Sequence, residues 1–458
     1  MTGLINSPSI VKRYSWANVV LFLLLPVSAQ ATEAGTPPSG GVADGSAETR
    51  SVRPSEDPAS LTAHALPLTL AECYGLALKR SETIAIQAEL VRQTEGRFIQ
   101  ALSTALPDVA FESSEKRQDG GGGSAFTLKH VPERKFTFSQ PLFAGFKEFS
   151  AMRGSRAERR ERLQQKARAE QLLFVDVADA FYLFLEHQQD AQILTAVRDA
   201  LQARIDELTE RERLGRSRAS EVVSAQAQLG RVDAQVEGVR SDAVVSRQLL
   251  EFLTGTSPIT AVSEAGFTVP ALEAEAVYLA KSSARPDVRA AEEAWRVFRE
   301  AMRIAQATFF PTVDLEGNYY TKRVGVSQSV DWDALLTVRV PLFQGGEAFG
   351  ATKEASSKAR QAKLHFDQTA RSASLEIQHV YARLQAALAR QAALEQALAA
   401  SEEDYRLQVE DYRRSLVNNL DVLRTLQTLQ DARRDALHAQ YETKRLYWQL
   451  RVATGEVL

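Results

Sequence analysis

The sequence predicts a mainly α-helical protein with a small β part, in which long antiparallel coiled-coil helices adjoin two β-hairpins. Three observations support this fold class. The 458-residue chain repeats itself at an interval of about 200 residues; each copy has a proline-free stretch of more than 60 residues rich in helix formers; and each has two short segments of alternating apolar and polar residues. We therefore expect one elongated body made of two copies of one unit rather than several globular domains.

Charge and the rarer side chains narrow the classes of function. The formal net charge is −3, whereas nucleic-acid-binding proteins usually carry a basic patch, so no nucleic-acid partner is expected. The single cysteine, Cys73, cannot form an internal disulfide or a cysteine-based metal site. None of the six histidines has a second histidine three to five residues away, which argues against a histidine metal site. We expect no metal site and no cofactor.

The N-terminus is typical of a secretory signal. Basic residues precede the apolar run 19–25, and Ala29-Gln30-Ala31 fits an Ala-x-Ala cleavage site. A membrane anchor is the alternative, but the run is far shorter than the ~20 residues that a spanning helix needs. We predict a signal peptide over 1–31, a disordered Gly/Pro/Ser-rich linker over 32–66, and an exported mature chain without a transmembrane helix.

Cys73 allows two interpretations. Leu70-Ala71-Glu72-Cys73 weakly resembles a lipid-attachment signal, but it lies far beyond the apolar run, and Glu72 stands where a small residue is needed. The surrounding segment 68–78 has the pattern of an amphipathic helix start. We therefore favour a buried structural thiol.

The internal repeat has several matched anchors. Pro141-Leu142-Phe143 recurs as Pro341-Leu342-Phe343, and Leu253-Thr254-Gly255 matches Ala453-Thr454-Gly455 at the same interval of 200 residues. Upstream, Leu106-Pro107 matches Phe310-Pro311, so copy one is four residues longer between anchors, where it has a glycine run typical of a surface loop. We predict repeat 1 over 67–255, a linker over 256–275 and repeat 2 over 276–455.

Each copy is predicted to contain the same elements in the same order. A helix ends before a proline, because the residue before proline is disfavoured in the α region. Two strands of a hairpin follow, then a long helix and a shorter partner helix. The predicted elements are helices 84–105 and 287–309, strands 109–112, 136–139, 313–316 and 336–339, long helices 146–212 and 347–413, and partner helices 218–253 and 418–453.

The long helices should pair as antiparallel coiled coils. At ~1.5 Å per residue, each would be a rod of roughly 100 Å. Leucines recur three or four residues apart from 416 to 429, which places them on one helix face. Many alanines lie along the first rod of copy two and allow close approach of its partner.

The predicted strands have one apolar and one polar face. Four strands cannot close a barrel, because the smallest membrane barrels have about eight, and a bilayer forbids open sheet edges. If these strands enter a membrane, the chain must oligomerise, and the apolar faces 109/111, 136/138, 313/315 and 336/338 would meet lipid. The alternative is that the hairpins cap a soluble bundle. The residues expected to line the lumen are Thr137, Ser139, Asp314, Glu316, Asn318 and Arg339.

Taken together, these features resemble the TolC-like outer-membrane efflux protein family, the outer membrane factors, from Leu68 to Gly455. The resemblance rests on Leu68-Thr69-Leu70, Leu106-Pro107-x-Val109 and the duplicated Pro-Leu-Phe-x-Gly motif at a constant interval. It implies a homotrimer with a twelve-stranded transmembrane β-barrel in the outer membrane. This β-barrel continues into an α-helical barrel in the periplasm. It also implies a passive exit duct, not an enzyme, for a tripartite efflux pump or a type I secretion system. The expected partners are outer-membrane lipid, a periplasmic adaptor (membrane fusion) protein and an inner-membrane pump.

The same resemblance suggests a gate at the turns 214–217 and 414–417, where the long helices reverse. Asp421 matches an acidic residue that faces the closed pore in several members, and Glu221 is its repeat partner. In a trimer Asp421 would form a ring of three carboxylates that favours cations. Arg424, where some members have a second acid, would partly neutralise that ring. Solvated charges are the alternative for these residues.

Two further sets of residues follow from the resemblance. Tyr412 matches a tyrosine that helps to hold the tip closed in some members, although a packing role is the alternative. Ser415 replaces the usual glycine, so the second turn is expected to differ in detail. The strand-to-helix transition is assigned to Pro141, Gly145, Pro341 and Gly345.

Other classes of protein fit the sequence less well. A periplasmic adaptor would have one helical hairpin and no doubled Pro-Leu-Phe motif, and a purely structural coiled-coil protein would lack strands of matched phase. No Gly-x-Ser-x-Gly motif is present, and the glycine run 120–123 lacks the flanking strand and helix of a phosphate-binding loop. The exported cargo, whether drug, metal, polysaccharide or protein, is left open.

Overall fold

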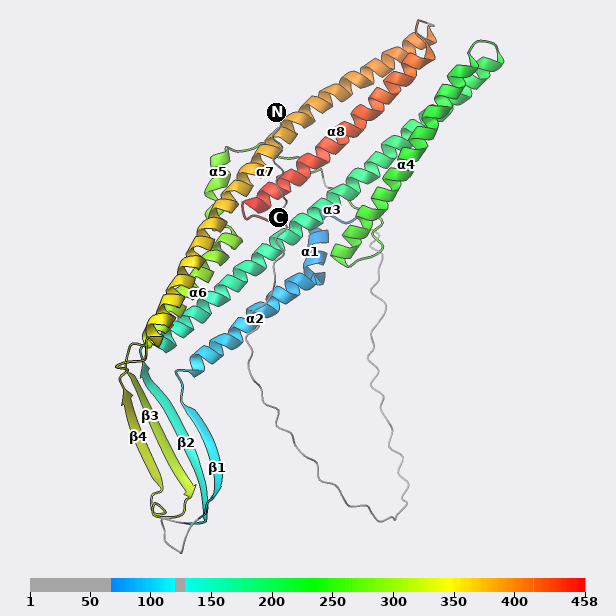
Figure 1. Cartoon of the computed structure of the whole chain (residues 1–458). Helices are drawn as coiled ribbons and strands as arrows, with labels where there is room; N and C mark the ends of the chain where they lie inside the picture. Colours follow the sequence, from blue (N-terminus) through cyan, green and yellow to red (C-terminus); the bar gives the residue numbers. More distant parts are fainter. Residues whose placement is uncertain (1–66, 120–127, 265, 415, 458) are drawn as a thin grey trace, which may run out of the picture. The chain divides into compact units, whose positions relative to one another are not determined.

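The computed structural model describes residues 67–119, 128–264, 266–414 and 416–457 (Figure 1). The predicted signal peptide (1–31), the predicted linker (32–66) and the glycine run lie outside these residues. Within the described part, no helix is both long and apolar enough to cross a membrane.

Long helices and one small sheet make up the described chain, which confirms the predicted fold class. Helices α3 and α7 each have 67 residues and begin 200 residues apart, within one residue of their predicted starts. The elements are α1 (Leu70–Arg80), α2 (Glu82–Ser103), β1 (Asp108–Arg117), β2 (His130–Ala144), α3 (Lys147–Arg213), α4 (Ala219–Thr254), α5 (Glu275–Ala280), the 3₁₀ turn η1 (Ser282–Ala284), α6 (Pro286–Ala307), β3 (Thr312–Lys322), β4 (Trp332–Arg339), α7 (Glu347–Arg413) and α8 (Asn419–Ala453).

The first helix begins with a reciprocal cap. The side chain of Thr69 accepts a hydrogen bond from the Glu72 backbone N–H, and the Glu72 carboxylate accepts one from the Thr69 N–H at 2.8 Å. Ser81 ends α1 and caps α2, so the chain bends there. Cys73, within α1, is fully buried, and burial raises the pKa of its thiol to about 12. The expected structural thiol is confirmed, because such a buried, neutral thiol is inert.

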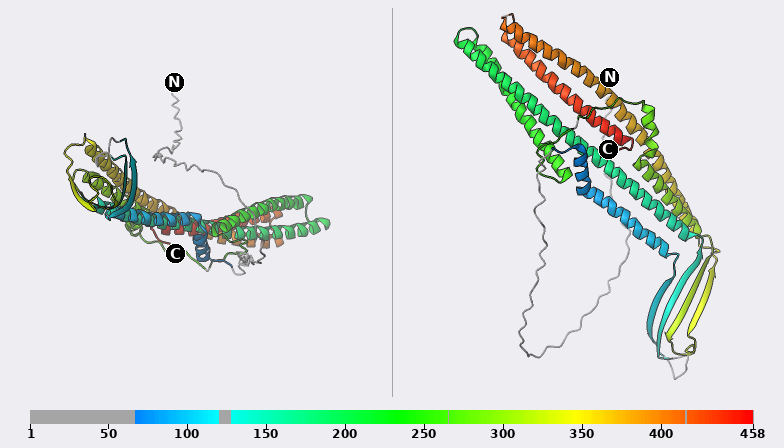
Figure 2. Two further views of the ribbon diagram at one scale, coloured as in Figure 1. Left: turned by 90° about the horizontal axis from the view of Figure 1, so that it is seen from below. Right: turned by 180° about the vertical axis from the view of Figure 1, so that it is seen from behind.

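The sheet is antiparallel in the order β1-β2-β3-β4 and extends from one end of the helices (Figure 1). Its register places four aromatic residues on one face: Phe111 lies opposite Phe136, Phe136 opposite Tyr319, and Tyr319 opposite Trp332. Seen from below, the sheet is curved (Figure 2). Strands β1 and β4 are the edges, and each has one side that no described strand pairs with.

The end of β2 corrects one expectation. We expected the chain to re-enter a helix after Pro141, but β2 continues to Ala144, whereas β4 ends before Pro341. Strand β2 is central, and its pairing with β3 continues past Pro141 through a register irregularity, with Phe143 opposite Val313. A bulge tolerates a residue without an N–H donor. Strand β4 has no such second neighbour in the part of the chain that the structure describes.

Helices α2, α3, α6 and α7 continue from the four strands, and α4 and α8 pair with the far parts of α3 and α7 (Figure 2). Helix α3 packs against α4, α6, α2 and α8, whereas α7 packs mainly against α8 and α6. The main core lies where α1, α3, α4 and α8 meet, around Phe174, Phe181 and Leu250. Helix α3 is therefore the central support of the protomer.

Gly145 and Gly345 occupy the same repeat position in different surroundings. Both have positive φ, at 65° and 61°. A Cβ atom on Gly145 would lie 2.7 Å from the Ala307 carbonyl oxygen and 2.9 Å from Cβ of Phe310, whereas none of the described atoms lies within 4 Å of one on Gly345. Gly145 thus permits close contact between the start of α3 and the end of α6.

We expect Gly145→Ala to destabilise the protein by about 1–3 kcal/mol more than Gly345→Ala. Both substitutions place alanine in the left-handed region, which costs about 1–2 kcal/mol, but only the first adds a clash with backbone. Thermal unfolding in detergent, followed by circular dichroism, should show the larger fall in Tm for Gly145→Ala. Equal falls would mean that α6 moves away freely.

Candidate gate at the helical tips

The turns at the ends of the two long hairpins are closed by equivalent hydrogen bonds. The Arg216 N–H donates to the Arg211 carbonyl oxygen at 2.8 Å, and the Leu416 N–H donates to the Asp411 carbonyl oxygen at 2.9 Å. Gly215 takes a φ of 69° in the first turn. Ser415 lies outside the described residues, but the bond that spans it matches the first turn.

Tyr412 joins the second hairpin to the first. It lies near the end of α7 and is buried, with 8% of its surface exposed. The Nη1 of Arg211 on α3 donates to the Tyr412 hydroxyl at 2.9 Å. The guanidinium of Arg204, also on α3, lies 3.9 Å from the ring centroid, which is within the range of a cation–π contact. Two arginines of repeat 1 therefore hold one tyrosine of repeat 2.

Arg204 extends this contact to α8. Its Nε donates to Oδ1 of Asn419 at 2.8 Å, and its Nη1 donates to Glu207 at 2.6 Å. Asn419 is almost fully buried. The Nη2 of Arg204 and the Nδ2 of Asn419 have no hydrogen-bond partner among the described residues. Unsatisfied buried donors each cost about 1–3 kcal/mol. These two donors therefore offset part of the stability that the hydrogen bonds of Arg204 give to the contact between the hairpins.

Asp421, Glu221 and Arg424 are not brought into one cluster. Asp421 takes part in a capping box at the start of α8: its carboxylate accepts from the Asn418 N–H at 3.3 Å, and Asn418 Oδ1 accepts from the Asp421 N–H at 3.1 Å. Glu221 accepts a hydrogen bond from Ser217 at 2.8 Å. Arg424 is exposed and has no ion-pair partner in the described chain. The pore-facing role of these residues stays a prediction.

A groove of about 430 Å³ lies between the starts of α4 and α8. Glu221 of repeat 1 lines it together with Asn418 and Asn419 of repeat 2, whereas Asp421 does not. Sequence reasoning missed Arg204, Arg211 and Asn419. Their only sequence signal was their position near the predicted turns.

The six residues predicted to line the lumen share one face of the sheet. The register sets Thr137 opposite Asn318, Ser139 opposite Glu316, and Arg339 opposite Thr312, two positions from Asp314 on β3. The register therefore places these residues on one face, and the lumenal role of that face stays a prediction. Asp333, which the short predicted strands did not include, accepts hydrogen bonds from Asn318 and Tyr320, both at 2.8 Å.

A buried ion cluster joins α3 to α8 midway along the helices. The Asp190 side chain is 2% exposed, and both its oxygens accept from Arg434, at 2.6 and 2.8 Å. His438 Nδ1 lies 2.5 Å from Glu186, and its Nε2 lies 3.8 Å from Asp190. The hydrogen bond with Glu186 raises the pKa of His438, although burial opposes the shift. Repeats 1 and 2 are thus held together by charge as well as by apolar packing.

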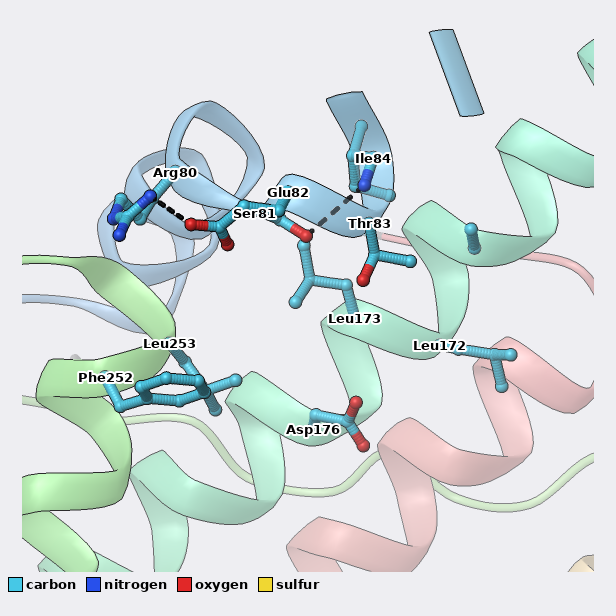
Figure 3. Close-up of a pocket in the computed structure, with 11 residues that line it drawn as sticks. Arg80, Ser81, Glu82, Thr83, Ile84, Leu172, Leu173, Asp176, Phe252 and Leu253 are labelled. Atoms are coloured by element: carbon cyan, nitrogen blue, oxygen red, sulfur yellow. Dashed lines mark hydrogen bonds and ion pairs between the residues drawn. The ribbon is translucent and has the colours of Figure 1, made fainter. Parts of the chain in front are cut away.

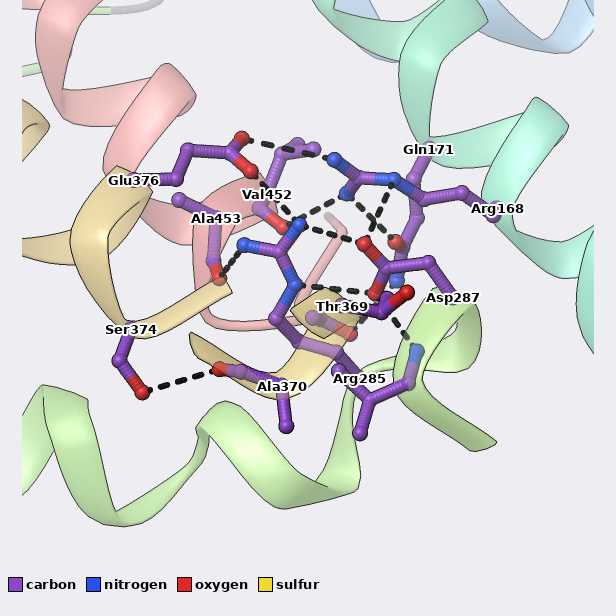
Figure 4. A network of polar contacts seen from close by, with 12 residues as sticks. Arg168, Gln171, Arg285, Asp287, Thr369, Ala370, Ser374, Glu376, Val452 and Ala453 are labelled. Carbon is purple, nitrogen blue, oxygen red and sulfur yellow. Dashed lines mark hydrogen bonds and ion pairs between the residues drawn. The ribbon is translucent and has the colours of Figure 1, made fainter. Parts of the chain in front are cut away.

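A second buried network surrounds Arg285, at the start of α6 (Figure 4). Arg285 is 1% exposed and donates to Asp287 at 2.8 Å, to Glu376 at 2.7 Å and to the Ala453 carbonyl oxygen at 3.0 Å. Arg168 on α3 donates to Glu376 at 3.4 Å. Burial favours a higher pKa for Asp287, but its bonds to Arg285 outweigh that effect and lower it. The network connects α3, α6, α7 and the end of α8.

A hollow of about 280 Å³ lies at the bend between α1 and α2 (Figure 3). Arg80 and Glu82 form an ion pair at its rim. Burial raises the pKa of Asp176 on its α3 wall. The described lining holds no histidine or cysteine and is otherwise mostly apolar, with Phe252 of α4 78% exposed. This composition is typical of a surface that packs against another chain rather than of a catalytic site.

Comparison with known proteins agrees with this architecture. Outer membrane protein TolC of Vibrio cholerae is 22% identical over 330 residues, 69% of this chain and 75% of that protein. Protein CyaE of Bordetella pertussis is 26% identical over 341 residues, 70% of each chain. The crystal structure of the outer membrane protein VceC from Vibrio cholerae has a TM-score of 0.74 at 21% identity and covers 84% of this chain and 96% of that one.

A sheet that continues into paired helical rods is the fold that this chain shares with the solved structures of VceC and CusC. The family model for outer membrane efflux proteins matches residues 73–256 and 279–456, so this chain belongs to the outer membrane efflux protein family. It is an outer-membrane channel that acts as a passive exit duct in efflux or secretion and is not an enzyme. Family members work with adaptor proteins and inner-membrane pumps.

Proposed function

We propose that three copies of this chain form one duct, whose periplasmic end is held closed by the contacts of Tyr412 with Arg204 and Arg211. A periplasmic adaptor and an inner-membrane pump would engage that end and supply the energy. The observation that carries the gate is the Arg211–Tyr412–Arg204 contact between the two hairpins.

Several features of the protomer support a trimer. Among the described residues both edges of the sheet are unpaired, and three four-stranded sheets would supply twelve strands, enough to close a barrel. The apolar face of the sheet is exposed in the protomer, as Val109 and Trp332 illustrate at 64% and 68% exposure, and lipid would cover it. Val245, Leu249 and Phe252 form an exposed apolar stripe on α4 that a neighbouring protomer would cover.

Opening would move α7 and α8 away from α3. That movement breaks one charge-assisted hydrogen bond to Tyr412, two cation–π contacts and the bond from Arg204 to Asn419. Together they amount to a few kcal/mol per protomer. Asp421 also caps the start of α8, and in a trimer its three copies would add a ring of carboxylates at the trimer axis.

Replacing Tyr412 by leucine is expected to open the channel. Losing about 2 kcal/mol of closing energy shifts a two-state equilibrium roughly 30-fold toward the open state. The conductance of the resting channel in planar bilayers should therefore rise severalfold. Tyr405→Leu is the matched control. Tyr405 and Tyr412 line one cavity between α3, α7 and α8, but Tyr405 receives no hydrogen bond within the described chain.

Asp421→Asn belongs in the same recordings, since asparagine retains a cap acceptor while removing the charge. The preference for cations should fall without a change in the resting conductance. If Tyr412→Leu behaves like Tyr405→Leu, the tyrosine clamp is not the gate. An unchanged cation preference in Asp421→Asn would remove the acidic ring from the proposal.

A further inference from the structure

A groove between α3 and α6, close to the sheet, concentrates positive charge. It has a volume of about 340 Å³ and contains a single described carboxylate, Glu300. Arg153 lies 3.4 Å from Glu300, and Arg303 also pairs with it. The described arginines that line the groove are Arg153, Arg156, Arg160, Arg296, Arg299 and Arg303.

The arginines farther from the sheet have their own partners. Arg160 lies 2.9 Å from Glu293, and Arg296 lies 2.8 Å from the same carboxylate and 2.6 Å from Glu292. The group nearer the sheet (Arg153, Arg156, Arg299 and Arg303) is different, because Glu300 is its one carboxylate among the described residues, so positive charge is in excess there. We refer to these four residues as the sheet-proximal arginines.

Arg156 and Arg299 carry most of this excess. No carboxylate within the described chain pairs with either of them. Instead, Arg156 lies 5.4 Å from the centroid of the Phe98 ring, and Arg299 lies 5.1 Å from that of Trp295. These aromatic contacts orient the guanidinium groups without neutralising them. Each planar group keeps N–H donors of the kind that bind phosphate in a bidentate manner.

The groove continues the apolar face of the sheet. Phe143 lies opposite Val313, on that face. Its ring contacts Phe146 at 5.2 Å between centroids, and Phe146 contacts Phe149 at 6.3 Å. Arg153 and Arg156 follow Phe149 by four and seven residues, which places them on the same face of α3.

The depth of the sheet-proximal arginines fits the headgroup layer of a bilayer. A helical rise of ~1.5 Å per residue puts Arg153 about 6 Å and Arg156 about 10 Å beyond Phe149. Arg303 lies four residues before the end of α6, and Ala307 at that end lies against Gly145, just before α3 begins. A headgroup layer is about 5–8 Å thick on each side of the hydrocarbon core, and arginine side chains reach several ångströms toward it.

We propose that the sheet-proximal arginines bind the phosphate of a phospholipid headgroup in the periplasmic leaflet of the outer membrane. The inference rests on the proposed lipid contact of the apolar face. The lipid acyl chains would cover the neighbouring phenylalanines, while the phosphate would accept from Arg156 and Arg299. This contact would fix the height of the channel in the membrane.

The test is lipid binding to the full-length protein in detergent, measured by native mass spectrometry. We expect phosphatidylglycerol to bind the wild type and to bind Arg156→Gln/Arg299→Gln about tenfold more weakly, a factor that a single lost ion contact readily gives. Arg371→Gln/Arg383→Gln is the matched control. Both arginines are exposed on α7, without an ion pair in the described chain and roughly 36 and 54 Å from its sheet end.

Equal lipid binding by the double variant and the control would overturn the proposal. So would equal binding of diacylglycerol, which lacks the phosphate. Displacement of the lipid by an equal concentration of inorganic phosphate would also overturn it, because it indicates a soluble anion site. A changed anion permeability with unchanged lipid binding would place the arginines in the lumen and also refute it. Absence of pores in the wild type counts against the trimer, whereas loss of lipid binding alone concerns the groove.

Discussion

Arg434→Met is expected to lower the free energy of unfolding by about 3–5 kcal/mol, because it leaves the carboxylate of Asp190 buried without its partner. Both oxygens of Asp190 accept from Arg434, and the carboxylate side chain is 2% exposed. Chemical denaturation in detergent would measure the loss. Arg433→Met is the control: Arg433 lies next in sequence, but it pairs with the exposed Glu402, so we expect less than about 1 kcal/mol there.

The Arg434→Met defect should depend on pH through His438. The folded-state pKa of His438 is raised, so its contribution to stability is complete below the unfolded pKa of about 6.5 and is lost as pH rises through the folded value. The imidazolium, 3.8 Å from Asp190, would partly replace the missing arginine at acidic pH. We therefore expect a smaller defect at low pH than at high pH, and Asp190→Leu/Arg434→Met should recover most of the lost stability. A defect equal to that of Arg433→Met would show that Asp190 does not need this partner.

Arg285→Met is expected to cost about 3 kcal/mol, at the lower end of the range for breaking a buried pair. Its partners Asp287 and Glu376 are partly exposed, so water can solvate them after the substitution. The Ala453 carbonyl oxygen would also lose its donor. Because this network joins four helices, unfolding should also become less cooperative.

Arg289→Met provides the comparison for Arg285→Met. Arg289 lies one turn further along α6, is exposed and has no ion pair within the described residues, so its replacement should change stability by less than about 0.5 kcal/mol. Thermal unfolding of both variants, followed by circular dichroism, would distinguish them. If the two variants unfold at the same temperature, the buried network is not a joint of the structure.

The long helices could be predicted closely, and the strands less so. A proline-free run of helix formers specifies α3 and α7 locally, so their bounds differ little from the predicted ones. Strand β2 contains Pro132 and Pro141, which on local rules should end a strand, yet its two neighbours keep it paired over 15 residues. Tertiary pairing overrides local preference there.

The site was predictable only in part. Tyr412 was identified through family resemblance, but Arg204 and Arg211 resemble the many other charged residues of a solvated helix. Only the packing of α3 against α7 and α8 selects them. The same is true of Asp190 and Arg434, which are 244 residues apart in sequence. Contacts between repeats depend on the relative placement of rods, which a single sequence does not specify.

The two long helices have equal length but unequal anchorage within the protomer. Helix α3 buries 19 of its 67 side chains, whereas α7 buries seven, and none of those lies between Ala387 and Tyr412. In mechanical terms, α3 is a stiff beam and the distal part of α7 is compliant. A force applied at the tip by another protein would therefore bend α7 first, while α3 transmits little of that strain to the membrane end.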